Sequence, residues 1–103
     1  MTSLKDTVEM MQSADYKERF IAEYRQTKIR YEKLKSFNTR IEAARLTMKS
    51  GKALEMPKHD CPDALLRRQQ SVMGEYLHIL EVRAEIEGVS LAEQGETCHA
   101  EKR

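Results

Sequence analysis

Residues 15–50 read DYKERFIAEYRQTKIRYEKLKSFNTRIEAARLTMKS and contain neither glycine nor proline. Apolar and aromatic side chains recur here at alternating intervals of four and three residues, which is the spacing of one face of an α-helix. The members of this seam are Phe20, Tyr24, Thr27, Tyr31, Leu34, Asn38 and Ile41. The stretch predicts one helix of about 35 residues, roughly 52 Å long. Gly51 is expected just beyond its C-terminus.

A second long helix is predicted after a solvated linker at residues 51–61. Pro62 suits its first turn, where the missing N–H costs nothing, and Asp60 or Cys61 is the expected cap. Gly88 is expected to end the helix. Its wide apolar face consists of Leu65, Leu66, Gln69, Val72, Met73, Tyr76, Leu77, Leu80 and Ala84.

A short helix is predicted at the N-terminus. Ser3 and Asp6 have the spacing of a capping box, in which each side chain bonds the backbone N–H of the other residue. Leu4, Val8 and Met11 would form its apolar face.

The predicted fold class is all-α, with two long helices in an antiparallel, coiled-coil-like hairpin and the short helix added. Residues 1–91 are expected to form a single helical domain, and residues 92–103, almost without apolar side chains, a flexible tail. Small domains bury only part of their apolar surface. We therefore expect a homo-oligomer, with a dimer as its simplest closed form.

Composition narrows the class of protein. The chain has 103 residues, a net charge of +1 and two cysteines. This length excludes a large enzyme with a deep private active site, and this charge excludes a uniformly basic nucleic-acid coat. No apolar run approaches the ~18 residues of a membrane span. Two cysteines make no disulfide framework, so a cytoplasmic location is expected.

Catalytic and metal-binding patterns are weak. His59, Cys61, Cys98 and His99 offer four nitrogen and sulfur ligands, but their spacing matches no strong zinc pattern. The simpler interpretation of Cys61 is a residue at the start of a helix. The sequence contains no glycine-rich phosphate-binding loop. The sequence predicts a protein that is not an enzyme and has no catalytic residue, metal site or cofactor.

The distribution of charge is more informative. Residues 16–52 carry eleven Lys and Arg against four Glu, a local net charge of +7, whereas residues 71–101 have a net charge of −6. Two interpretations stay open. Either the basic helix lies beside the acidic helix of the same or another chain, or its basic groups face an anionic ligand.

Aromatic and basic side chains alternate within the basic stretch. Tyr24, Lys28 and Tyr31 share one helix face, and Arg83 continues the apolar stripe of the other long helix. Aromatic rings stack on bases while Lys and Arg bind phosphates. The alternative is that the tyrosines are core residues and Arg83 has an internal partner. The candidate ligand-binding residues, in a pocket between chains, are Tyr24, Lys28, Tyr31, Arg45, Arg67 and Arg83.

Two segments carry a resemblance to known proteins. DYKERFIAEYRQTKIRYEKLKSF (15–37) and PKHDCPDALLRRQQSVMGEYLHILEVRAEIEGVSL (57–91) resemble small all-helical proteins of bacteriophages and prophages. In architecture the chain resembles the anti-CBASS sponges, which form hexamers of helical hairpins and sequester cyclic oligonucleotides with a Tyr, a Lys and an Arg. Residues 73–84 are similar in shape to the corresponding segment of those sponges.

The resemblance implies a function in the cytoplasm of a bacterial host. It implies an anti-defence protein that binds and sequesters a nucleotide immune signal, such as a cyclic nucleotide, in a pocket between chains. One alternative is an inhibitor that binds a host defence protein, for example a CRISPR effector. Another is an accessory protein that binds DNA weakly through the basic helix.

Overall fold

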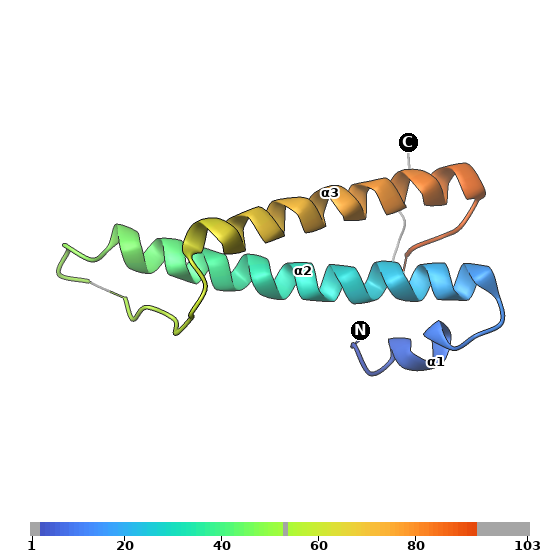
Figure 1. The fold of residues 1–103 in the computed structure, drawn as a ribbon, viewed down its shortest axis with the longest axis horizontal. Coiled ribbons are helices and arrows are strands. Elements are labelled where there is room, and N and C mark those ends of the chain that lie inside the picture. Colours follow the sequence, from blue (N-terminus) through green and yellow to red (C-terminus); the bar gives the residue numbers. More distant parts are fainter. Residues whose placement is uncertain (1–2, 53, 93–103) are drawn as a thin grey trace. The chain divides into compact units, whose positions relative to one another are not determined.

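Three helices form the fold in the computed structural model, which describes residues 3–52 and 54–92 (Figure 1). They are α1 (Thr7–Met11), α2 (Tyr16–Leu46) and α3 (Asp63–Glu87), and the described residues contain no strand. The all-helical prediction is therefore confirmed. The chain divides into two compact units, unit 1 of Met1–Ile29 with Leu77–Arg103 and unit 2 of Arg30–Tyr76.

The predicted seam of α2 is confirmed residue by residue. Phe20, Tyr24, Asn38 and Ile41 are buried, and the three remaining members are half-buried. The seam is continuous because each step of three or four residues returns to the same side of the helix.

Two helix boundaries differ from the prediction, namely the C-terminus of α2 and the N-terminus of α3. α2 ends at Leu46, because the Thr47 hydroxyl donates to the Ala43 carbonyl (2.8 Å) and accepts from the Leu54 N–H (3.2 Å). The helix does not reach Ser50. At α3, the Pro62 carbonyl accepts the first helical N–H bonds. Pro62 thus takes the cap position predicted for Asp60 or Cys61.

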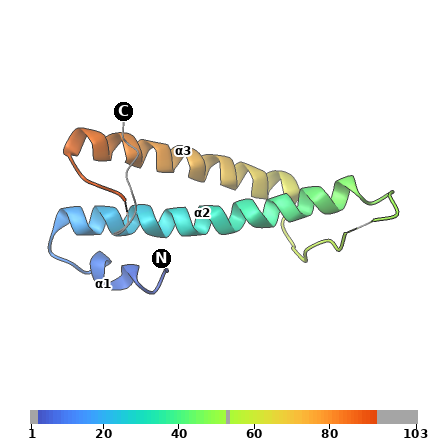
Figure 2. The ribbon, with the colours of Figure 1, turned by 180° about the vertical axis from the view of Figure 1, so that it is seen from behind.

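Unit 1 contains α1, the beginning of α2 and the end of α3. Gly88 ends α3 as predicted, with φ at +72°, and the Val89 N–H donates to the Ala84 carbonyl over 2.9 Å. The chain then turns back toward α2, where Arg25 donates to the Ala92 carbonyl over 3.1 Å (Figure 2). Val89 is buried in the core of this unit.

The short helix presents a different face from the one predicted. The Ser3–Asp6 capping box is present, with N–O distances of 3.0 and 3.3 Å. The hydrogen bond from the Ser3 backbone N–H to the Asp6 carboxylate lowers the pKa of Asp6. Thr7 is fully buried, whereas Val8 and Met11 are exposed. Thr7 faces α2 because its hydroxyl accepts a hydrogen bond from the Gln26 side chain of α2 over 3.1 Å.

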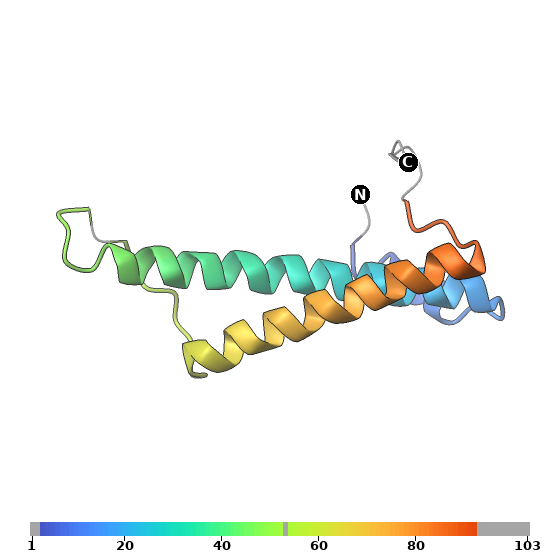
Figure 3. The same cartoon turned by 90° about the horizontal axis from the view of Figure 1, so that it is seen from above.

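Unit 2 contains the end of α2, the connection and the beginning of α3. The connection folds back along the last turns of α2 before α3 begins (Figures 1 and 3). Ile41 and Ala44 are buried, and Leu66 and Met73 of α3 are half-buried.

Part of the predicted apolar face of α3 is exposed. Of its members, Leu65, Val72 and Tyr76 are 53%, 56% and 39% exposed. Ile79 and Ile86, which are not members of the predicted face, are also exposed. A single helix covers only a narrow stripe of its neighbour, so the rest of a wide apolar face stays in solvent.

None of the described helices is long and apolar enough to cross a membrane.

Candidate ligand-binding site

Unit 2 contains an open groove of about 540 Å³ between α2 and α3. Its volume lies within the range of small-molecule sites. The groove is lined from α2 by Tyr31, Lys35, Asn38, Thr39 and Glu42, and from α3 by Arg67, Gln70, Ser71 and Gly74. Its walls therefore combine an aromatic ring, two cations, one carboxylate and several uncharged polar groups.

Gly74 allows the ring of Tyr31 to lie directly against α3. A Cβ atom at position 74 would be 3.3 Å from the Tyr31 Cε1 atom and 3.5 Å from its hydroxyl oxygen. The first separation is tighter than an ordinary contact between carbon atoms, and the second is an ordinary contact. The missing side chain of Gly74 thus sets the position of the ring at one end of the groove.

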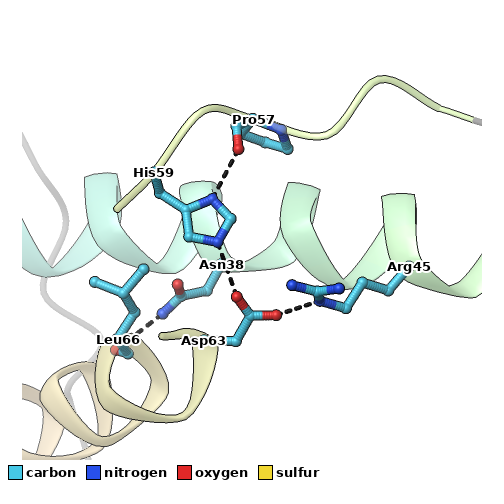
Figure 4. Close-up of polar contacts among 6 residues, drawn as sticks. All are labelled: Asn38, Arg45, Pro57, His59, Asp63 and Leu66. Atoms are coloured by element: carbon cyan, nitrogen blue, oxygen red, sulfur yellow. Dashed lines mark hydrogen bonds and ion pairs between the residues drawn. The ribbon is translucent and has the colours of Figure 1, made fainter. Parts of the chain in front are cut away.

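Asn38 joins the two helices beneath the groove. Its Nδ2 donates to the Leu66 carbonyl (3.1 Å, Figure 4) and to the Gln70 Oε1 atom (2.9 Å). The Leu66 carbonyl only accepts, which fixes the orientation of the amide. The side chain is buried, and its Oδ1 atom has no hydrogen-bond partner among the described residues. The polar seam position predicted from sequence therefore holds two named groups of α3 in register.

A polar cluster of His59, Asp63 and Arg45 ties the connection to both helices (Figure 4). His59 Nδ1 contacts the Pro57 carbonyl oxygen at 2.7 Å, and its Nε2 contacts Asp63 Oδ1 at 2.8 Å. Arg45 forms an ion pair with the other oxygen of Asp63. The His59 ring also packs edge-on against Phe37, with ring centroids 5.8 Å apart.

The charges in this polar cluster stabilise one another. The hydrogen bond to the Pro57 carbonyl, followed by the one to Asp63, raises the pKa of His59 above its usual value. Hydrogen bonds from Arg45 and then His59 lower the pKa of Asp63 to about 2. Both ring nitrogens of His59 face oxygen acceptors, so the doubly protonated form satisfies both contacts.

The structure places the six sequence-predicted site residues in different surroundings. Tyr31 and Arg67 line the groove of unit 2, whereas Arg45 contacts Asp63 in the polar cluster. In unit 1, the Tyr24 hydroxyl donates to Glu81 over 2.6 Å, and the Lys28 ammonium lies 5.9 Å from the centre of the Tyr24 ring. Tyr24 is also buried, as the core alternative expects.

Arg83 lies in a second set of contacts within unit 1. Its guanidinium donates to the Tyr16 hydroxyl (2.6 Å) and to Glu87 (3.3 Å), and it lies 4.9 Å from the centre of the Phe20 ring. Arg83 therefore has partners within its own unit, as the alternative of an internal partner expects.

Seven groove residues were not among the predicted site residues, namely Lys35, Asn38, Thr39, Glu42, Gln70, Ser71 and Gly74. Two signals point to them. Lys35 follows Tyr31 by four residues, so it shares the same helix face. Gly74 stands inside a helix, where glycine is unfavourable by about 1 kcal/mol and usually has a packing reason.

The metal hypothesis has no counterpart where the chain is described. No group of three or more His, Cys, Asp or Glu residues is arranged there to hold a metal ion. Cys61 is a free, exposed thiol. Cys98, His99 and the predicted tail beyond Ala92 lie outside the described residues.

The described residues form an all-helical protein with a groove that is a candidate binding site. The Sequestin family matches residues 14–86, which is more than half of the chain. The chain belongs to the Sequestin family, whose name indicates binding and sequestering. No curated protein and no solved structure matches the chain.

Proposed function

We propose that the protein is a non-enzymatic sponge that captures a nucleotide immune signal in the groove of unit 2. The observation that carries this proposal is that Tyr31, Lys35 and Arg67 line one groove. Membership of the Sequestin family supports the sequestering function. The resemblance to phage and prophage proteins supports an anti-defence role in the cytoplasm of a bacterial host.

The side chains of the groove match the parts of a nucleotide. The Tyr31 ring offers a face on which a base stacks, and Lys35 and Arg67 offer positive charge to phosphates. Glu42 and Gln70 carry oxygen atoms that accept hydrogen bonds from the N–H groups of a base. One acid beside two bases gives the lining an excess of positive charge, which favours an anionic ligand.

A second copy of the chain would enclose the ligand. The groove is open on one side, and a pocket between chains is what the resemblance to sponges implies. Exposed apolar side chains on α3, such as Val72 and Ile79, support a homo-oligomer. The contacts of Tyr16 with Glu87 in unit 1 and of Arg45 with Asp63 in unit 2 support the antiparallel hairpin.

The exposed apolar side chains also favour one alternative function. They would equally suit a surface that blocks a host defence protein, such as a CRISPR effector. Exposed lysines of α2, such as Lys33, support the DNA-binding alternative. A protein inhibitor would ignore nucleotides, and a DNA binder would show a steep dependence of its affinity on salt.

A thermal-shift screen with cyclic dinucleotides and cyclic trinucleotides tests the proposal. A ligand that binds only the folded protein raises its melting temperature, so we expect a rise of several degrees for the matching nucleotide. Lys35→Ala should abolish most of this rise because it removes a cation from the groove. Lys33→Ala is the matched control, since Lys33 is an exposed lysine of the same helix that does not line the groove.

Two results would contradict the nucleotide proposal. One is the absence of any shift with every nucleotide tested. The other is an equal loss of response in Lys33→Ala and Lys35→Ala, which would indicate a general charge effect instead of a site in the groove.

A further inference from the structure

We propose that two copies of the chain pair through the exposed face of α3 in unit 2, antiparallel and centred near Val72. In this pairing Arg68 of each copy lies opposite Glu75 of the other. The inference rests on the homo-oligomer of the proposed function and names the surface and the register of one contact between its copies, separate from the contact that encloses the ligand. Below, the pairing face means Leu65, Arg68, Val72 and Glu75.

The apolar part of the pairing face is exposed although it lies on a long helix. Leu65 and Val72 are 53% and 56% exposed and stand seven residues apart, which places them on the same side of α3. Tyr76, 39% exposed, extends this side by one turn. Seven-residue spacing of apolar side chains is the pattern by which one helix packs against another.

The charges beside this apolar row are arranged for pairing with a second copy. Arg68 stands four residues before Val72 and Glu75 three residues after it, so opposite charges flank the centre at nearly equal distances. A two-fold axis near Val72 brings each Arg68 opposite the Glu75 of the other copy. Within the described part of the chain, neither residue forms an ion pair. A single antiparallel contact would therefore place two oppositely charged pairs around an apolar centre.

The pairing face and the groove use different sides of α3. Arg67, Ser71 and Gly74 line the groove, whereas Leu65 and Val72 do not. Each residue turns an α-helix by about 100°, so Leu65 lies roughly opposite Arg67 and Gly74 around the helix axis. Pairing through this face leaves the groove of each copy accessible. Closure of a groove by another chain would need a separate contact.

A charge-swap experiment on the ligand-free protein tests the pairing. Sedimentation equilibrium should show a dimer for the unchanged chain. Arg68→Glu alone and Glu75→Arg alone each replace two attractive contacts by two repulsive ones, so each should weaken dimerisation by about tenfold or more. The double variant Arg68→Glu/Glu75→Arg restores opposite charges and should dimerise again. Lys33→Glu, which lies on α2, is the control for a change in net charge and should stay dimeric.

Three outcomes would overturn the proposed pairing. An unchanged chain that is monomeric at all concentrations removes the pairing, and dimers unaffected by either single swap place the interface elsewhere. A double variant as weak as the single variants rejects the register. Circular dichroism confirms that each variant is folded, which is expected because both side chains are exposed. The nucleotide thermal shift is measured on the same variants. If it survives in a monomeric variant, loss of pairing is distinguished from loss of ligand binding.

Discussion

Single residues determine the shape of the groove. Gly74 gives up helix stability so that the Tyr31 ring can approach α3, and Asn38 holds Leu66 and Gln70 of the same helix. The sequence predicted Tyr31 and Arg67 as site residues from aromatic and basic side chains at helical spacing, and both line the groove. It did not identify Arg45 as a partner of Asp63, because that contact depends on the path of the connection.

A methyl group at position 74 should separate stability from ligand binding. Gly74→Ala favours the helix by about 0.5–1 kcal/mol but places a Cβ atom 3.3 Å from the Tyr31 ring, which must shift by a few tenths of an ångström. We expect a melting temperature at least as high as that of the unchanged protein and a clearly smaller shift with nucleotide. Gly51→Ala is the control, since an added Cβ there meets nothing within 4 Å. A full nucleotide response in Gly74→Ala would show that the ring position does not matter.

The elements show where local patterns are sufficient and where they are not. The seam of α2, the capping box at Ser3 and the end of α3 at Gly88 follow from local spacing, and the structure confirms them. The end of α2 and the buried face of α1 depend on hydrogen bonds to distant residues, of Thr47 with Leu54 and of Thr7 with Gln26. The periodicity of a sequence contains no information about such contacts. The predicted end of α2 and the predicted buried face of α1 were therefore wrong.

The connection between α2 and α3 should respond to pH through His59. Because the pKa of His59 is raised in the folded chain, its stabilising contribution is complete below pH ~6.5 and is lost as the pH rises through the folded value. The lowered pKa of Asp63 acts in the opposite sense, and its contribution is lost only in acid, as the pH falls below ~3.8 toward about 2.

Denaturant unfolding of the unchanged protein and of His59→Gln from pH 5 to pH 9 checks this expectation. The stability difference between the two should be largest at the acid end of this range and should shrink as the pH rises. His78→Gln is the control, because the side chain of His78 is 74% exposed. A stability difference between His59→Gln and the unchanged protein that is constant from pH 5 to pH 9 would contradict a stabilising role of protonated His59.

At the scale of the whole molecule, sequence patterns predict the class of fold and the kind of function. The all-helical fold and the sequestering function of the family agree with what the seam spacing and the phage-protein resemblance implied. The groove is beyond sequence reasoning alone, because its two walls come from residues that are 25 or more positions apart in unit 2.

Capture and release of an intact nucleotide tests the central claim most directly. The protein, in excess, is mixed with the cyclic nucleotide that gives the largest thermal shift, and the free nucleotide is measured by chromatography after ultrafiltration. We predict that the nucleotide disappears from the filtrate and is recovered chemically unchanged after the protein is denatured by heat. A nucleotide that stays in the filtrate, or one recovered only as a cleaved product, would contradict the account.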